Sequence, residues 1–363
     1  MKPTMTPCPF ADEGVLITGG TQGIGLRTAA AFLELGASRV HIVGRSKTKG
    51  LAAKDELVEF ARANAHGPCL KAHTDWQSLV HFHAVDVGAV EGNESAIARL
   101  LASPAFRDDM CTHPVKYAVN SAGVSGFIGA THSLTPALLL NDNDNAYRTN
   151  LLGNLWSISA EWAYFREVAA TCKTTREFSI VALSSYNGIR ACPTCAVYGS
   201  TKFGINGLVQ STAIEAKTDT KVKGTAGEDL TMTLRVNSVC PGLVATPLTF
   251  NQARGDIGLQ GYQCCDGAFR DASVAECGQA LKNGSATRVS STLLCRDARE
   301  CACPNVAQGD PAIASVFPED MLAAIMDPSE IATAVVTLSD NQRSAGVTAA
   351  VVSVDRGDAA GTG

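Results

Sequence analysis

Short apolar runs alternate with amphipathic segments along most of the chain. The runs predict buried strands at Gly14–Thr18, Arg39–Val43, His81–Val85, Val115–Val119, Phe178–Ser184, Thr231–Val239 and Val347–Val354. Between them, apolar positions recur at helical spacing, which predicts helices over Leu26–Leu35, Leu51–Asn64, Gly92–Leu101, Asp144–Thr171, a segment that ends near Glu215, and Asp327–Leu338. Strands that alternate with helices form parallel sheets. The pattern therefore predicts an α/β fold, a doubly wound parallel sheet in a single domain over residues 1–363.

One long stretch, Thr249 to Pro318, interrupts this alternation. We expect it to be an insertion within the domain. It is rich in cysteine, with Cys264, Cys265, Cys277, Cys295, Cys301 and Cys303. Zinc binding is disfavoured because the C-x2-C pairs of a zinc ribbon are missing. Disulfides are a second interpretation, and reduced thiols are the favoured one.

The composition limits the classes of partner. A formal net charge of −5 without a basic block argues against nucleic-acid binding. No apolar run approaches the roughly 20 residues of a membrane span. The first ten residues lack the apolar core of a secretory signal, so the expected location is cytoplasmic.

Thirteen cysteines are many for such a chain. Cys172 ends a predicted helix and Cys240 follows a predicted strand, where a thiol behaves as a small hydrophobic side chain. In the cytosol, cysteines are expected to stay reduced.

A glycine-rich turn joins the first predicted strand to the first predicted helix. It spans Gly19 to Gly25 in the pattern G-x-x-x-G-x-G. Such a turn lets the backbone approach a pyrophosphate, which then lies at the positive end of the helix. This context predicts a dinucleotide-binding, Rossmann-type domain. The turn after the second strand carries Arg45 and Lys47 and no acidic residue, which favours NADP(H) over NAD.

The segment Ser185 to Lys202 contains the candidate chemistry. Tyr198 and Lys202 stand four residues apart, and residues at that spacing share one face of a helix. An adjacent cation favours the phenolate and is expected to lower the tyrosine pKa. Ser185 follows a predicted buried strand, at the edge where α/β sheets bind ligands. These residues form a candidate proton-transfer site.

Two other local patterns have weaker interpretations. His81 and His83 share one strand face without a nearby third ligand, so hydrogen-bonded or solvent-facing side chains are favoured over a metal site. Cys192 and Cys195 form a C-x-x-C pair outside the usual redox context. A wall of the substrate pocket is the favoured role for that pair.

Taken in order, these motifs resemble the short-chain dehydrogenase/reductase family, in its single-domain branch with a Y-x-x-x-K active site. The resemblance covers about residues 12–250 and 325–357 and implies a hydride transfer between a nicotinamide and a carbonyl or alcohol. It also implies that the insertion at Thr249 to Pro318 covers the substrate site as a mobile lid. The family's catalytic tetrad corresponds to Asn150, Ser185, Tyr198 and Lys202. Ser185 is chosen over Ser184 because it stands thirteen residues before the tyrosine.

The resemblance also implies a set of cofactor-binding residues. Phosphate contacts correspond to Thr18, Gly19, Gly23, Ile24 and Gly25. Adenine contacts correspond to Asp86 and Val87, and the family's N-N-A-G motif to Asn120, Ala122 and Gly123, with Ser121 in place of the second asparagine. The nicotinamide carboxamide corresponds to Pro241, Gly242 and Thr246, and Tyr198 and Lys202 also contact the cofactor. The family's V-D-G-G is matched by residues 354–357 with one substitution.

In the implied mechanism, Tyr198 exchanges the proton and Ser185 positions the reacting oxygen. Lys202 lowers the tyrosine pKa and binds the nicotinamide ribose, while Asn150 holds a helix kink and a relay water. The expected activity is NADP(H)-dependent interconversion of an alcohol and a ketone or aldehyde, by a homodimer or homotetramer. A non-catalytic dinucleotide-binding regulator and an epimerase or dehydratase on the same fold remain alternatives. The sequence does not identify the substrate.

Overall fold

We describe a computed structural model of the chain. The structure describes residues 8–70, 75–92, 94–139, 145–174, 176–244, 246, 248–249 and 326–355. The predicted lid lies outside these ranges except for Thr249, and so do all six of its cysteines.

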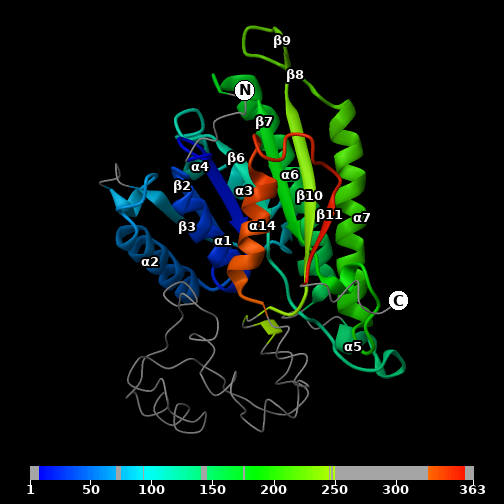
Figure 1. Cartoon of the computed structure of the whole chain (residues 1–363). Coiled ribbons are helices and arrows are strands. Elements are labelled where there is room, and N and C mark those ends of the chain that lie inside the picture. Colours follow the sequence, from blue (N-terminus) through cyan, green and yellow to red (C-terminus); the bar gives the residue numbers. More distant parts are fainter. Residues whose placement is uncertain are drawn as a thin grey trace.

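Seven parallel strands form the central sheet (Figure 1), in the order β11-β10-β7-β6-β1-β2-β3. The strands are β1 (Gly14–Thr18), β2 (Arg39–Gly44), β3 (Val80–Ala84), β6 (Val115–Asn120), β7 (Glu177–Leu183), β10 (Thr233–Pro241) and β11 (Val351–Val354). The chain reverses its direction of travel across the sheet between β1 and β6, which are neighbours. The predicted doubly wound parallel sheet is confirmed.

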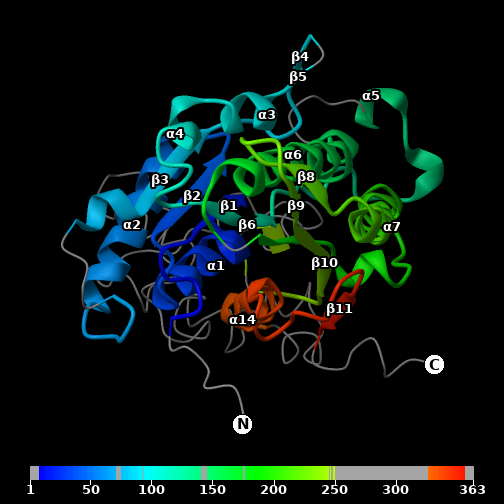
Figure 2. The same cartoon turned by 90° about the horizontal axis from the view of Figure 1, so that it is seen from above.

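Helices cover both faces of the sheet (Figure 2). One face carries α1 (Gly23–Glu34), α2 (Lys47–Ala63) and α14 (Pro328–Ser339). The other carries α3 (Ala96–Leu101), α4 (Pro104–Arg107), α6 (Gly153–Thr171) and α7 (Ala196–Thr218). The shorter elements are α5 (Pro136–Leu139), the strands β4 (Val90–Glu91) and β5 (Glu94–Ser95), and single turns at Trp76–Leu79, Thr131–Ser133 and Tyr186–Gly188.

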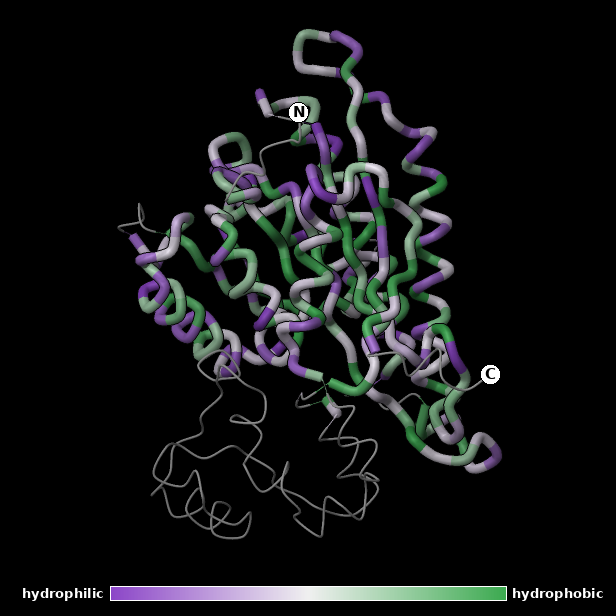
Figure 3. The backbone as a smooth tube through the Cα atoms, in the orientation of Figure 1, coloured by the Kyte–Doolittle hydropathy of each residue, from purple (hydrophilic) through white to green (hydrophobic). Residues whose placement is uncertain are grey.

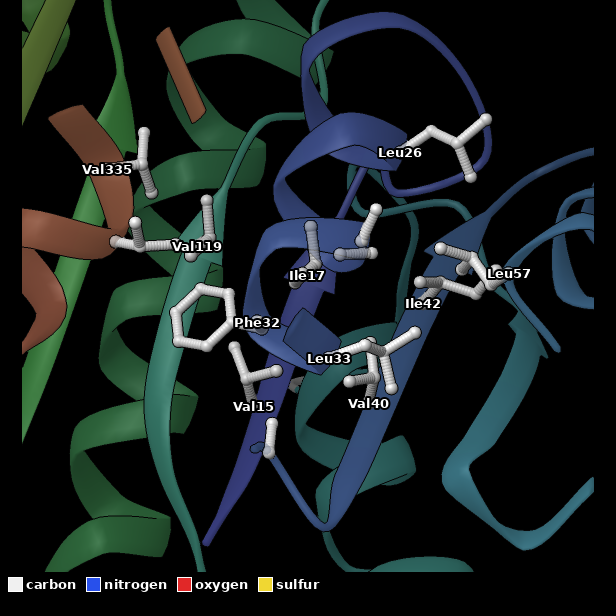
Figure 4. Packing of buried hydrophobic residues seen from close by; sticks show 14 of the residues in the cluster. Val15, Ile17, Leu26, Phe32, Leu33, Val40, Ile42, Leu57, Val119 and Val335 are labelled. Atoms are coloured by element: carbon white, nitrogen blue, oxygen red, sulfur yellow. The ribbon is translucent and has the colours of Figure 1, made fainter. Parts of the chain in front are cut away.

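The apolar strands lie between two hydrophobic layers (Figure 3). In the layer of α1, Phe32 and Leu33 pack on Val15, Ile17 and Val40 of the sheet (Figure 4), and all five are fully buried. Each such side chain contributes roughly 1.5–3 kcal/mol by its removal from water. These layers fix the strands whose ends carry the candidate site.

Three predicted elements differ from the structure. Part of the polar segment after α7, predicted as a loop, forms a hairpin of β8 (Lys221–Lys223) and β9 (Asp229–Thr231). The last strand is shorter than predicted and begins at Val351. The long helix before β7 opens with a π-helical turn, Tyr147–Leu152, followed by α6.

The apolar positions of α6 at helical spacing are not all buried. Leu155 is 42% exposed, whereas Asn154 and Glu161 are buried. The buried face of this helix is therefore mixed in polarity, because it packs beside polar residues at the sheet edge as well as on the hydrophobic layer.

The expectation of reduced cysteines is also wrong in the described part of the chain. Disulfides join Cys8 to Cys69 and Cys111 to Cys172, with Cα–Cα distances of 5.4 and 5.0 Å. Each pair is 61 residues apart in sequence, so only the fold brings its members together. Cys240 is a buried thiol, as predicted.

The two predicted histidines are hydrogen-bonded. His83 Nε2 lies 3.0 Å from His41 Nδ1, and His81 Nε2 lies 3.0 Å from the carbonyl oxygen of Ser78. Burial lowers the pKa of all three histidines, and that of His83 falls to about 4. The hydrogen-bonded interpretation is thus confirmed, and the neutral rings form part of the packing between β2 and β3.

Among the described residues, no helix has the length and apolar character needed to cross a membrane.

Candidate active site

The predicted site residues gather at one edge of the sheet. Because all seven strands are parallel, their carboxyl ends share that edge. β1 ends at Thr18, β6 at Asn120, β7 at Leu183 and β10 at Pro241. Residues from separate parts of the sequence therefore lie next to one another.

The glycine turn packs closely against the end of β6. Gly19 has a φ of +69°, in the left-handed region that favours glycine, and a Cβ there would lie 2.6 Å from the Ala122 nitrogen. A Cβ on Gly25 would overlap the carbonyl oxygen of Gly19. Gly23, φ +55°, begins α1 directly after the turn. Only glycines allow this close approach, which fits a turn that receives a pyrophosphate at the start of a helix.

Hydrogen bonds between buried polar groups join this turn to the end of β6 and to α6. Thr18 Oγ1 donates to Asn120 Oδ1 at 3.3 Å and accepts from the Ala122 nitrogen at 3.4 Å. Asn120 Nδ2 in turn donates to Glu161 Oε2 of α6 at 2.9 Å. Asn120 and Glu161 are each 1% exposed. The segment Asn120–Gly123 is therefore joined to the glycine turn through the side chain of Thr18.

Glu161 was not identified from the sequence. Burial raises the pKa of its carboxyl to about 8, against a smaller lowering by the Asn120 amide. Its Oε1 has no partner in the described part of the chain. A protonated carboxylic acid suits this position, because burying a carboxylate without a cation is costly. Its place on the polar face of α6, with Asn154 and Ser157, was the available indication.

The predicted adenosine end of the site lies at the rims of β2 and β3. Arg45 is exposed and directly follows β2. Asp86 Oδ1 accepts a hydrogen bond from the Gly88 nitrogen at 2.9 Å, which shapes the turn after β3. Val87 is 5% exposed and lies where a Cβ on Gly153 of α6 would clash. Ile24, half-buried, packs at the start of α1.

The predicted carboxamide segment follows β10. Pro241 is paired with Val354 of β11, and the Gly242 nitrogen donates to the Val354 carbonyl oxygen at 3.0 Å. Thr246 is 6% exposed, and its hydroxyl lies 3.2 Å from that of Thr249. The segment is therefore anchored to the last strand at the same edge.

Tyr198 and Lys202 lie on the first turns of α7, where both side chains are buried, 7% and 4% exposed. Lys202 Nζ lies 5.5 Å from the centre of the Tyr198 ring and donates to the Leu183 carbonyl oxygen at 2.8 Å. The tyrosine hydroxyl is hydrogen-bonded to Ser185. The predicted proton-transfer residues are therefore together.

The predicted direction of the tyrosine pKa shift is wrong for this structure. Burial raises the pKa of Tyr198 to about 12, although the hydrogen bond from Ser185 lowers it in part. Burial also lowers the pKa of Lys202 to about 8. Desolvation is the largest cause of both shifts. At neutral pH the tyrosine is a protonated phenol, and the lysine is an ammonium that readily loses a proton.

The two adjacent serines have different surroundings. Ser184 Oγ donates to the Lys202 carbonyl oxygen at 2.9 Å and is buried against α7. Ser185 is half-buried, and its oxygen accepts from the Asn187 nitrogen at 3.1 Å. Ser185 thus faces the tyrosine hydroxyl, and Ser184 holds the backbone of the lysine.

Asn150 is fully buried inside the π-helical turn before α6. Its amide brackets the backbone of Val124, accepting from the nitrogen at 2.8 Å and donating to the oxygen at 2.9 Å. It also donates to Thr201 Oγ1 at 3.1 Å. A Cβ on Gly123 would lie 3.5 Å from Asn150 Oδ1 and 3.7 Å from Lys202 Nζ. Asn150 therefore joins the loop after β6 to the helix of Tyr198 and Lys202.

Asn206, a buried residue near Lys202, was also not identified from the sequence. Asn206 lies one turn after it and donates to the Gly188 oxygen at 3.0 Å and to Cys240 Sγ at 3.6 Å. Ser238 Oγ donates to Asn206 Oδ1 at 2.9 Å. Its spacing of four from Lys202 on one helix face was the available indication. These contacts fix the turn after β7 against β10.

This arrangement can transfer a proton to an oxygen placed between Tyr198 and Ser185. The phenol is the donor, the serine hydroxyl is a second hydrogen-bonding group, and Lys202 is a proton source near physiological pH. The glycine turn at Gly19–Gly25 lies beside it and has the form of a site for a dinucleotide phosphate. Among the described residues, no cluster of three or more histidine, cysteine or acidic side chains could hold a metal ion.

Known proteins share both the sequence pattern and the fold. Among curated proteins, the chain is 25% identical over 256 residues to "Short-chain dehydrogenase/reductase ABA4" of Pyricularia oryzae (strain 70-15), covering 66% of this chain and 72% of that protein. It is also 25% identical over 240 residues to "3-oxoacyl-[acyl-carrier-protein] reductase FabG" of Chlamydia muridarum, covering 66% of this chain and 77% of that protein.

Two solved structures have the same fold. Levodione reductase aligns with a TM-score of 0.62 and 21% identity, covering 97% of this chain and 100% of that one. A singly substituted form of actinorhodin polyketide ketoreductase with NADPH aligns with a TM-score of 0.59 and 23% identity, covering 96% of this chain and 98% of that one.

The family profile described as "short chain dehydrogenase" matches residues 13–256, which include the glycine turn, Asn120–Gly123, Ser185 and the Tyr198–Lys202 pair. The chain is therefore a member of the short-chain dehydrogenase/reductase family, oxidoreductases that act on CH–OH and C=O groups.

Proposed function

We propose that the protein is an NADP(H)-dependent oxidoreductase that interconverts a ketone or aldehyde and the corresponding alcohol. The observation that carries this proposal is the buried, protonated Tyr198, hydrogen-bonded to Ser185 beside the glycine turn. The phenol, with a pKa of about 12, is protonated at neutral pH and can donate to a carbonyl oxygen. In the reverse reaction the same oxygen takes the proton of the alcohol.

When bound, the nicotinamide supplies the hydride that reduces the carbonyl carbon. Ser185 orients the carbonyl oxygen by a hydrogen bond, and Tyr198 donates its phenolic proton to that oxygen. Lys202, with a pKa of about 8, then returns a proton towards the tyrosine and is reprotonated from solvent. Asn150 positions Lys202 indirectly, through its bonds to Val124 and Thr201.

The cofactor would lie along the edge from Arg45 to Thr246. Its phosphates would contact Gly19, Gly23 and Gly25, and its adenosine would lie near Asp86 and Val87. Two features favour NADP(H) over NAD. Arg45 is exposed at the end of β2, where an arginine suits a 2′-phosphate, and the ketoreductase that shares this fold holds NADPH.

A panel of ketones and aldehydes, each tested with NADPH and with NADH, checks this function. We expect oxidation of NADPH with at least one carbonyl and slower oxidation of NADH. No oxidation of either cofactor across the panel would instead support a dinucleotide-binding regulator. Nicotinamide that remains bound through purification would support an epimerase or dehydratase.

We also propose that the enzyme is a homodimer or homotetramer that pairs through α6 and α7. Both helices expose large apolar side chains: Leu155 is 42% exposed, Phe203 48% and Ile214 62%. Light scattering after gel filtration should give a multiple of the 37.8 kDa chain mass. Ile214→Glu combined with Phe203→Glu should shift the distribution towards monomer, and an unchanged mass would contradict this interface.

Two further predictions about the whole chain are untested. The lid role of residues 249–318 within a single domain remains a prediction. The cytoplasmic location also remains a prediction, and the two disulfides, which are typical of oxidising compartments, weigh against it.

A further inference from the structure

Two thiols lie in one tight turn directly before α7, the helix of Tyr198 and Lys202. Cys192 and Cys195 enclose Pro193 and Thr194, and the Cys195 nitrogen donates to the Cys192 oxygen at 3.4 Å. Such a four-residue turn brings its end Cα atoms within about 7 Å. A disulfide spans Cα–Cα distances of roughly 4.4–6.8 Å. The backbone therefore already holds the two cysteines at bridging distance.

The two sulfurs differ in exposure. Cys192 is exposed, and its Sγ lies 3.4 Å from the Pro193 carbonyl oxygen. Cys195 is half-buried at the start of α7, three residues before Tyr198. Of the other described cysteines, four are in disulfides and Cys240 is buried. A solvent-borne oxidant therefore meets Cys192 first, with Cys195 as its neighbour.

The turn is also bonded to the loop after β6 and to the first turn of α7. The Thr194 oxygen accepts from the Gly129 nitrogen at 2.9 Å, in the loop after β6. The Cys195 oxygen accepts from the Gly199 nitrogen at 2.7 Å, in the first turn of α7. Thr194 has a φ of +63°, a left-handed conformation that costs a β-branched residue energy. A change of geometry between the two sulfurs would therefore reach both the loop and Tyr198.

We propose that Cys192 and Cys195 are a reversible dithiol–disulfide modification site that switches the enzyme off when oxidised. The oxidant class is a hydroperoxide. The Cys192 thiolate attacks one peroxide oxygen, the O–O bond breaks, and a sulfenic acid and a water or alcohol form. The Cys195 sulfur then attacks the Cys192 sulfur, forms the S–S bond and releases water. Two thiols lose two electrons and two protons, and the peroxide gains them.

Closing the bridge needs only a small adjustment of this turn, which is bonded to the first turn of α7 through the Cys195 oxygen and the Gly199 nitrogen. A small shift of that helical turn would be enough to disturb the hydrogen bond between Tyr198 and Ser185. Misplacing a reacting group by about 1 Å can cost on the order of 10²-fold in rate. The loss of turnover rests on the proposed function, whereas formation of the bond does not.

The test treats the full-length protein with hydrogen peroxide, blocks remaining thiols by alkylation and maps the peptides by mass spectrometry. We expect a peptide in which Cys192 and Cys195 are linked to each other, lacking two hydrogen atoms and restored by dithiothreitol. Cys192→Ser and Cys195→Ser should each abolish it, and Cys240→Ser, a matched change of the buried thiol, should not. Linkage of Cys192 to any other cysteine, or no linkage, would overturn the site.

Activity and cofactor binding are measured on the same samples. NADPH oxidation should fall by roughly 10- to 100-fold on oxidation and recover on reduction, and Cys192→Ser should be insensitive to the peroxide. A bridge that forms without any loss of turnover would overturn the switch. If no carbonyl is turned over at all, the proposed function fails while the peptide map still decides the site.

Discussion

The carboxyl edge of the sheet has two halves that are built differently: a cofactor half around β1 and β6, and a catalytic half around β7 and α7. Around β1 and β6, shape is set by the absence of side chains: Gly19 and Gly25 leave room that a single Cβ would fill. Around β7 and α7, Tyr198 and Lys202 are buried, and their protonation is set by desolvation. The first half should therefore be sensitive to volume and the second to proton chemistry.

The largest effect is expected from Tyr198→Phe, which removes the proton donor and leaves the ring. Turnover should fall by roughly 10²–10⁴-fold, the usual contribution of general acid catalysis, with little change in NADPH affinity. Steady-state kinetics and cofactor fluorescence titration measure the two effects. Tyr147→Phe is the control, since that phenol bonds Ser200 outside the site. Near-normal turnover in Tyr198→Phe would remove the assigned role.

Glu161→Gln tests the buried carboxyl that is hydrogen-bonded to Asn120 in the cofactor half. The folded pKa of Glu161 is raised to about 8 from a usual value of 4.5. Its stabilising contribution is therefore complete below pH 4.5 and is lost as the pH rises through 8. Between about pH 5 and pH 8 the wild-type protein should lose roughly 3 kcal/mol of unfolding free energy relative to Glu161→Gln.

Urea unfolding at both pH values measures this difference. Glu59→Gln, a change of an exposed glutamate on α2, should leave the wild-type pH dependence in place. Parallel pH curves for the wild type and Glu161→Gln would show that this carboxyl is ionised in the folded protein.

Gly25→Ala tests the dependence of the cofactor half on volume. The added methyl meets the Gly19 carbonyl oxygen, so the turn must move at a cost of about 1–3 kcal/mol. The dissociation constant for NADPH should rise by about 5- to 150-fold, as seen by fluorescence titration. Gly207→Ala on α7, where a Cβ would meet nothing within 4 Å, should bind normally. Equal binding by the two variants would refute the importance of close approach at Gly25.

Arg45→Asp should have the smallest effect. It should change the preference between NADPH and NADH more than the turnover rate. Loss of a charge-assisted hydrogen bond costs about 1.5–3 kcal/mol, so NADPH should lose roughly tenfold or more in kcat/KM while NADH is spared. Arg62→Asp, at the other end of α2, controls for the change of charge. An unchanged cofactor preference in Arg45→Asp would exclude this arginine as a phosphate ligand.

The sequence was sufficient for the sheet and for the grouping of the site, because both depend on local patterns. Apolar runs predicted each strand of the sheet, and residues that follow parallel strands must share an edge. The start of α14 was predicted as well, from Asp327 and Glu330, which form a capping box.

The rest depends on contacts between residues far apart in the chain. The Asn120–Glu161 bond joins two elements, and neither residue alone indicates it. The two disulfides join cysteines that no spacing rule pairs. The tyrosine pKa was mispredicted because spacing shows the neighbouring ammonium but not the depth of burial. In each case the sequence did not show which distant residues lie together in the fold or how deeply a side chain is buried.

The π-helical turn at Tyr147–Leu152 determines how the two halves are aligned. A regular helix advances about 100° per residue, and a wider turn accommodates one residue more. Asn150, which serves the catalytic half, lies within that turn, and Glu161, which serves the cofactor half, lies beyond it on α6. Deleting Leu152, which is 38% exposed, would rotate one group away from the other. The one extra residue of the π-helical turn therefore sets the relative orientation of the Asn150 amide and the Glu161 carboxyl around the helix.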